Sequence, residues 1–80
     1  MIDSMFSYTV SKTASENAFA KACSSIESHF KGIDKEKPLV DVDGSTIQIY
    51  RKGKASIKVY NDYEVDAVYV DSEVDLKNIM

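Results

Sequence analysis

Residues 39–70 read LVDVDGSTIQIYRKGKASIKVYNDYEVDAVYV. Apolar residues alternate with polar ones along this stretch, and short runs that contain Gly, Asn or Asp interrupt the alternation. A period of two in β-branched and aromatic residues is typical of strands that bury one face. The pattern predicts an antiparallel meander of four strands, Leu39–Asp43, Ser45–Arg51, Lys54–Tyr60 and Glu64–Val70.

The turns of this meander determine which residues face each other across neighbouring strands. Asp43-Gly44 suits a two-residue hairpin turn, because both residue types tolerate positive φ angles. Three-residue turns at Lys52–Lys54 and Asn61–Tyr63 then keep the apolar residues on one face, whereas two-residue turns would mix the faces. The predicted inner face carries Val40, Val42, Ile47, Ile49, Ala55, Ile57, Val59, Val65, Ala67 and Tyr69.

A helix is the natural cover for this inner face. Apolar residues from Ala14 onward recur at spacings of three, four and five, which places them in one stripe along a helix. Thr13 and Glu16 have the spacing of a capping box, and Gly32 suits a left-handed cap at the other end. We predict a helix from about Ala14 to Lys31.

Two further elements flank the helix and the meander. Met5–Val10 alternates as a strand does, and it can pair with either the Leu39 strand or the Glu64 strand. Ser72-Glu-Val-Asp75 resembles a second capping box, which predicts a short helix to about Ile79. The chain of 80 residues is therefore expected to form one α+β domain, residues 1–80, with the order β-α-β-β-β-β and a short C-terminal helix.

Composition indicates the compartment. The single cysteine, Cys23, excludes an intramolecular disulfide, which fits a reducing environment. No stretch approaches the roughly 20 apolar residues that a membrane helix needs. Met1–Val10 lacks the basic region of a signal peptide. We expect a cytoplasmic protein.

The residue types that catalysis requires are mostly missing. His29 is the only histidine, and it lies six positions after Cys23, so the two side chains leave a helix in different directions. We expect Cys23 to be a buried small apolar residue rather than a nucleophile. Lys52-Gly53-Lys54 has one glycine and lies between strands, so it is not a phosphate-binding loop. The sequence therefore predicts neither an enzyme nor a cofactor.

Metal ligands are also not arranged in a known pattern. Asp41-Val-Asp43-Gly44 resembles a fragment of a calcium-binding loop, but either register of that loop lacks acids at required positions. Turn chemistry explains this motif better. The chain has no paired His or Cys residues for zinc. We expect no metal site.

The predicted registers leave a second face of the sheet pointing outward. This face carries Tyr50, Tyr60 and Val68 among mixed charges, with Lys58 opposite Asp66. Tyrosine is enriched in protein interfaces because its rigid ring carries a polar tip. The face is either a contact surface anchored by these three residues or a solvated face with cross-strand packing.

Acidic residues are concentrated near the end of the chain. Residues 61–75 contain six acids and no base, within a net charge of −3. They either form a negative patch that meets a basic groove, or they provide solubility and favourable charge at a helix N-terminus. The predicted partner-binding residues are Tyr50, Tyr60, Val68, Glu64, Asp66, Asp71, Glu73 and Asp75.

In size, charge and expected architecture the chain resembles small inhibitors encoded by phages, such as anti-defence and anti-CRISPR proteins, and toxin-neutralising antitoxin or immunity proteins. The resemblance implies a non-catalytic protein-binding module that occupies a basic or nucleic-acid-binding site on a larger partner protein. A homodimer through a sheet edge or the tyrosine face is a further hypothesis.

The alternative hypothesis is an RNA-binding module. Arg51, Lys52, Lys54 and Lys58 cluster on one predicted hairpin, and basic groups with nearby aromatic rings such as Tyr50 and Tyr60 bind single strands in other proteins. The helix–strand–strand–strand–helix order also resembles double-stranded RNA-binding domains. Acids occupy residues 71–75, where that fold is normally basic, and they would repel phosphate.

Overall fold

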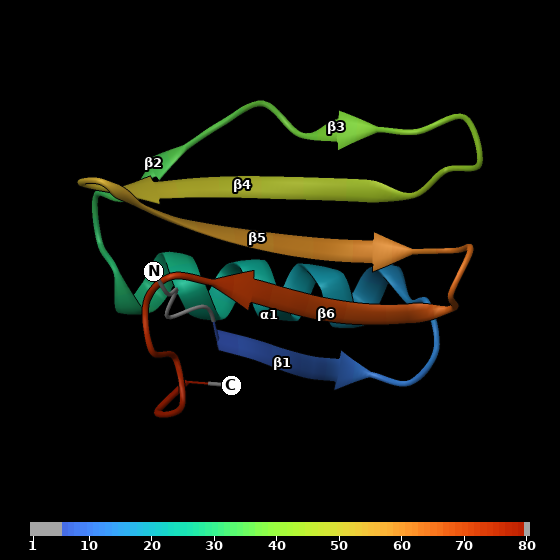
Figure 1. Ribbon diagram of the computed structural model, residues 1–80, viewed down its shortest axis with the longest axis horizontal. Coiled ribbons are helices and arrows are strands. Elements are labelled where there is room, and N and C mark those ends of the chain that lie inside the picture. The colour runs from blue at the N-terminus through green and yellow to red at the C-terminus, as the bar shows by residue number, and fades with distance from the viewer. Residues whose placement is uncertain (1–5, 80) are drawn as a thin grey trace, which may run out of the picture.

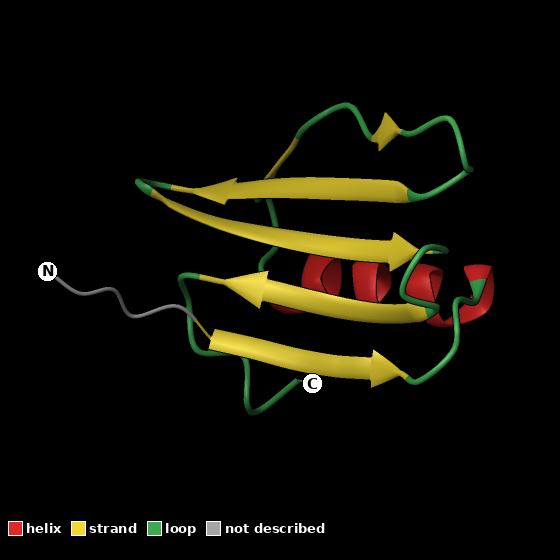
Figure 2. Ribbon diagram, turned by 45° about the vertical axis from the view of Figure 1, so that its right-hand side comes forward, coloured by secondary structure: helices red, strands yellow, loops and turns green. Residues whose placement is uncertain are grey.

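The computed structural model describes residues 6–79. Seven elements follow one another in this part of the chain (Figure 1): β1 (Phe6–Ser11), α1 (Glu16–His29), β2 (Asp34–Lys35), β3 (Leu39–Val40), β4 (Thr46–Lys52), β5 (Ala55–Asp62) and β6 (Ala67–Ser72). All six strands belong to one antiparallel sheet with the order β1-β6-β5-β4-β2, in which β3 also pairs with β4. The helix crosses only one face of the sheet (Figure 2). The predicted α+β class is confirmed.

The turn between β4 and β5 is one residue shorter than predicted. Lys52 pairs with Ala55 and Tyr50 pairs with Ile57, so Gly53 and the residue after it form a two-residue loop. Gly53 takes a φ of 63°, as the first position of a type II′ hairpin turn requires. A shift of one residue moves every side chain of β4 to the other face, so this register overturns the predicted one.

The turn between β5 and β6 is longer than predicted. Val59 pairs with Val70 instead of Val65, and Lys58 pairs with Asp71 instead of Asp66. The loop comprises residues 63–66, and it is stabilised because Asp62 Oδ1 accepts the N–H groups of Glu64 (2.9 Å) and Val65 (3.3 Å). Asp66 takes a φ of 60° at its end. Sequence pattern alone missed these side-chain contacts.

The turn between β3 and β4 also has a register different from the predicted one. Leu39, rather than Val40, pairs with Ile47. The Asp41 N–H donates to the Ser45 carbonyl (2.8 Å), which closes a loop of three residues around Gly44. Val42 lies in this loop and is 102% exposed, so its predicted place on the inner face is wrong.

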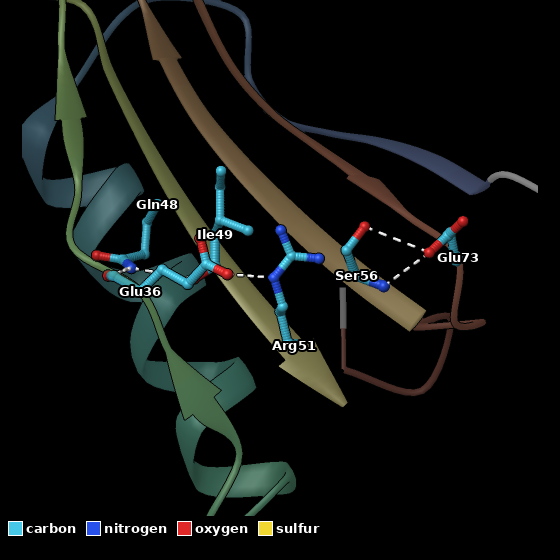
Figure 3. A network of polar contacts seen from close by, with 6 residues as sticks. All are labelled: Glu36, Gln48, Ile49, Arg51, Ser56 and Glu73. Carbon is cyan, nitrogen blue, oxygen red and sulfur yellow. Dashed lines mark hydrogen bonds and ion pairs between the residues drawn. The ribbon is translucent and has the colours of Figure 1, made fainter. Parts of the chain in front are cut away.

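The residues before β3, which were predicted to be a connector without regular structure, include a short strand. Asp34 and Lys35 form β2 against the end of β4. Gln48 Nε2 donates to the carbonyl oxygen of Glu36 (2.6 Å), while the Glu36 carboxylate pairs with Arg51 (Figure 3). Because Gln48 is buried at 4% exposure, this hydrogen bond satisfies a polar group that would otherwise be costly to place inside.

The helix begins two residues later than predicted. Ser15, not Thr13, is its N-cap, and the Ser15 Oγ accepts the N–H of Ala18 (3.2 Å). Asn61 Oδ1 accepts the N–H of Ser15 (3.1 Å), which ties the start of α1 to β5. The helix ends at His29 rather than Lys31, so the prediction is right in type and off by two residues at each end.

The two ends of the described chain decide where the amino-terminal strand pairs and show that the predicted C-terminal helix is wrong. β1 pairs with β6, so the amino-terminal strand lies beside the strand predicted from Glu64; Met5 of that prediction lies outside the described residues. Among residues 73–79 there is no helix: Ser72 Oγ accepts the N–H of Val74 (2.9 Å), and the chain then forms a turn in which the Ile79 N–H donates to the Leu76 carbonyl (2.9 Å). Leu76 is nonetheless buried, at 1% exposure.

The hydrophobic core lies between α1 and one face of the sheet. Ala22 and Ile26 of the helix contribute to it, as the apolar stripe predicts. The sheet contributes Ile57 and Val59, which are predicted correctly, and Tyr50, Val68 and Val70, which are not. Ile47, Ile49, Ala67 and Tyr69 instead belong to the opposite face, and Val65 belongs to a turn.

Candidate functional site

The face of the sheet opposite α1 carries a row of large side chains across three strands. Ile47 of β4 pairs with Tyr60 of β5, which in turn pairs with Tyr69 of β6. The two tyrosine rings stack, with centroids 4.6 Å apart and planes inclined by 15°. No described helix or strand covers this face (Figures 1 and 2). Partial exposure of these rings makes them available for contact.

Tyr69 is held in place and kept neutral. Its hydroxyl donates to Asp62 Oδ2 (3.1 Å). Partial burial, followed by this hydrogen bond, raises the pKa of Tyr69 to about 12. Partial burial also raises the pKa of Tyr60. The stack is therefore an uncharged aromatic surface at neutral pH.

Two turns meet beside this stack, and we call them the turn end, residues 39–45 and 62–66. The Tyr63 N–H donates to Ser45 Oγ (2.9 Å). A side chain placed on Gly44 would contact the Tyr63 ring at 3.7 Å, so the two turns lie against each other. Five of the six most exposed large apolar residues among residues 6–79 belong to the turn end: Leu39, Val40, Val42, Tyr63 and Val65.

The turn end is also acidic. It contains five carboxylates and no lysine or arginine, and its acids are Asp41, Asp43, Asp62, Glu64 and Asp66. The two ion pairs among the described residues, Lys35–Glu27 and Arg51–Glu36, lie elsewhere. Hydrogen bonds from Ser45, first from its N–H, lower the pKa of Asp43. This lowered pKa favours the charged form of Asp43, and no cation of the described chain forms an ion pair with a turn-end acid.

A groove of about 340 Å³ joins the turn end to the uncovered sheet face. Ile47 and the Tyr60–Tyr69 stack line it, together with Leu39 and Val40 of β3. Four of the turn-end acids, all except Asp66, line it as well. The groove thus combines an aromatic and aliphatic lining with several carboxylates.

The structure excludes two of the predicted anchors from any surface. Tyr50 and Val68 both have 0% exposure. The Tyr50 hydroxyl donates to Glu27 of α1 (2.5 Å), so this ring lies beneath the helix instead of on the outer face. The correction follows from the two altered registers, which place both residues on the covered side of the sheet.

The acids of the predicted patch lie in four separate places. Glu64 and Asp66 lie at the turn end, and the Asp66 carboxylate accepts the N–H of Ala14 (2.8 Å). Asp71 lies on the uncovered face, where it accepts from Ser7 Oγ (2.7 Å). The remaining two acids make contacts elsewhere, Glu73 with Ser56 (Figure 3) and Asp75 with Tyr8.

Sequence reasoning missed Asp41, Asp43 and Asp62 as members of the same surface. Residues 41 and 62 are far apart in the sequence, and only the paired hairpins bring them together. The signal available was the alternation of acids with Val42 beside a turn. The predicted registers instead assign Val42 to the inner face of a strand and Asp43 to a turn, so neither residue is expected at an exposed apolar surface.

The basic residues of the alternative hypothesis lie mainly at the opposite end of the sheet. Arg51 pairs with Glu36, and Lys52 Nζ lies 5.7 Å from the centroid of the Phe30 ring. Lys54 belongs to the β4–β5 turn, while Lys58 lies on the uncovered face beside Asp71. Because Tyr50 is buried, this group has no stacking ring from β4.

The lone cysteine and histidine occupy different surroundings. Cys23 is half-buried against the core, and burial raises the pKa of its thiol. His29 is exposed at the end of α1, and its ring forms a T-shaped pair with Phe30, with 4.7 Å between the centroids. Within residues 6–79, no cluster of acidic, His or Cys side chains converges on a metal position.

The one helix among the described residues lacks the length and apolar character needed to cross a bilayer. Comparisons of the chain with protein-family models, with curated proteins and with solved structures found no significant match.

Proposed function

We propose that the protein is a small non-catalytic protein-binding module that docks through the turn end and the adjoining uncovered sheet face onto a basic site of a larger protein. If that basic site binds nucleic acid, the module acts as an inhibitor by occupying it. The proposal is carried by the concentration of exposed apolar side chains and unpaired carboxylates on the same two turns.

The apolar part of the turn end supports docking because these side chains contribute little to the core. Val42, Val65 and Val40 are 102%, 62% and 69% exposed. Fully burying a valine-sized side chain is worth about 1.5–3 kcal/mol, and contiguous exposed apolar residues often mark interaction sites. A partner that covers these residues gains that free energy.

The acidic part supports the choice of a basic partner. Unpaired carboxylates around an apolar centre steer a positively charged surface toward it and disfavour acidic partners. The same charges keep phosphate away from the turn end. A nucleic-acid-binding groove of another protein offers the complementary charge.

A second candidate function concerns the opposite end of the sheet. A groove of about 390 Å³ beside the β4–β5 turn is lined by the basic residues His29, Lys31, Arg51 and Lys52 and by one acid, Asp34. These bases favour a phosphate-rich ligand such as RNA. Neutralising Lys52 and Lys54 would then weaken RNA binding and flatten its dependence on salt, as counterion release requires.

The test of the proposed function is capture of a partner by the tagged protein, compared among variants. Val42→Ser combined with Val65→Ser removes apolar surface from the turn end, and Val10→Ser removes it from β1, where Val10 is 36% exposed. We expect the double variant to lose the captured protein while Val10→Ser retains it. Equal capture by all variants would refute docking through the turn end.

Self-association is measured on the same samples by light scattering over a range of concentrations. A mass that stays monomeric, with a larger protein captured, supports the proposal. A dimer that dissociates in the Val42→Ser/Val65→Ser variant would show that a second copy, and not a larger protein, covers this surface.

A further inference from the structure

The turn-end groove has two linings of different chemistry. Ile47 and the Tyr60–Tyr69 stack provide apolar and aromatic surface. The acidic lining belongs to both turns, since Asp43 comes from the β3–β4 turn and Glu64 from the β5–β6 turn. A ligand that satisfies both linings must carry positive charge on a partly apolar, flat group.

We propose that this groove accepts an arginine side chain of the partner protein, with the guanidinium group among the carboxylates and beside the stacked tyrosine rings. The inference rests on the proposed function and names the chemistry by which the same surface recognises its partner. Arginine fits better than lysine because its planar guanidinium stacks on aromatic rings, bonds carboxylates through two donors and is weakly hydrated.

Two acids of the groove, Asp62 and Asp43, are held in position before any ligand binds. Asp62 accepts two backbone N–H groups through Oδ1 and the Tyr69 hydroxyl through Oδ2. Asp43 Oδ1 accepts the N–H of Ser45 (2.9 Å). Each of these carboxylates retains acceptor capacity, because an ionised carboxylate has about four lone-pair sites. Preorganised acceptors reduce the entropy that binding must overcome.

A second copy of this chain is a poorer occupant than another protein. The chain contains one arginine, Arg51, and its guanidinium pairs with Glu36 on the adjacent edge. Using Arg51 in the groove of another copy would break that pair. An arginine from a basic site of a different protein carries no such cost.

The test is a titration of the isotope-labelled full chain followed by amide chemical shifts in NMR spectra. The probe is the blocked peptide Gly-Arg-Gly, with the lysine peptide and the citrulline peptide as comparisons. Citrulline keeps the shape of arginine and removes its charge. We expect shifts at Ile47, Tyr60 and Tyr69 with the arginine peptide, weaker binding with lysine and none with citrulline.

Two sets of variants locate the binding site. Asp43→Asn combined with Glu64→Gln removes charge from the groove while keeping hydrogen-bond acceptors. We expect this double variant to bind the arginine peptide about fivefold more weakly than the wild type does. Glu73→Gln removes an acid at the other end of the sheet and should leave binding unchanged. The spectrum of each variant shows directly whether it remains folded.

The inference is overturned if the citrulline peptide binds as well as the arginine peptide, if the shifts map outside the groove, or if the groove variants bind as the wild type does. Its failure is distinguishable from that of the proposed function. If partner capture depends on Val42 and Val65 but the arginine peptide does not bind, only the inference is wrong. If the arginine peptide binds but partner capture does not depend on these valines, the proposed function is wrong.

Discussion

The hydroxyl of Tyr50, on β4, donates a hydrogen bond of 2.5 Å to the carboxylate of Glu27, on α1. This contact joins the helix to the sheet at the edge of the core. The Tyr50 ring is fully buried, whereas the Glu27 carboxylate reaches solvent, where it also forms an ion pair with Lys35 (3.0 Å). The hydrogen bond explains why a tyrosine that alternation alone would place outside lies under the helix.

Replacing Tyr50 by Phe should destabilise the protein without affecting partner binding. The change removes the hydroxyl and leaves the ring, so the expected loss is about 1.5–3 kcal/mol, the range for a hydrogen bond to a charged group. Urea unfolding measures the loss, and Tyr63→Phe, at an exposed ring, is the matched control. A stability equal to that of the wild type would mean that this contact contributes nothing.

Stability should decrease on acidification, in part through Glu27. The hydrogen bond from Tyr50, and then the one from Lys35, lower the pKa of Glu27 below its ordinary value of 4.5. The folded state therefore binds a proton at Glu27 less readily than the unfolded state does. The resulting stabilisation is complete above the ordinary pKa of 4.5, and it is lost as the pH falls through the lowered pKa of the folded state. Lowered pKa values of Asp43 and Asp75 act in the same direction.

The measurement is the melting temperature at a series of pH values between neutral and about 3, a range that spans ordinary carboxyl pKa values. Tyr50→Phe should show a shallower decrease than the wild type, because it lacks the contact that perturbs Glu27 most. Parallel curves for the two proteins would contradict this assignment.

The Tyr60–Tyr69 stack should contribute coupling free energy to the sheet. A double-mutant cycle with Tyr60→Leu and Tyr69→Leu is expected to give about 0.5–1.5 kcal/mol, the usual value for an aromatic pair beyond its buried area. Chemical denaturation of the four proteins provides the numbers. Additive effects of the two substitutions would show that the rings do not interact.

The two-residue turn at Gly53 predicts that substitutions at this position differ in how much they lower the stability of the protein. A φ of 63° is strained for residues with a side chain, although no atom lies within 4 Å of a Cβ placed there. Gly53→Ala should therefore cost about 1 kcal/mol, and Gly53→Asn should cost less, because asparagine tolerates positive φ. If alanine is neutral, the turn does not have this conformation.

Several features of the fold follow from local sequence. The stripe that includes Ala22 and Ile26 has the period of a helix, and the alternation around Ile57 and Val59 has the period of a strand. Each of these patterns is visible within a few residues of chain. The packing of one long helix on an antiparallel sheet could therefore be predicted from the sequence, whereas the predicted short C-terminal helix was wrong.

The candidate surface was only partly predictable. Tyr60 was identified because the alternation places it on the outer face, and Glu64 and Asp66 because they belong to the acid-rich segment 61–75. Asp41 and Val42 were not, because their neighbours on the surface come from another hairpin. Residues that are distant in sequence join one site only after the hairpins have paired.

By itself, the sequence determined the kinds of elements and the apolar face of the helix. Only the tertiary structure decided the registers of the sheet. Both alternating sets on β4 contain large residues, Ile47 and Ile49 on one side and Gln48 and Tyr50 on the other, so local hydrophobicity does not separate them. Hydrogen bonds from Tyr50 to Glu27 and from Gln48 to Glu36 satisfy the polar atoms of the second set, and those partners lie on other elements.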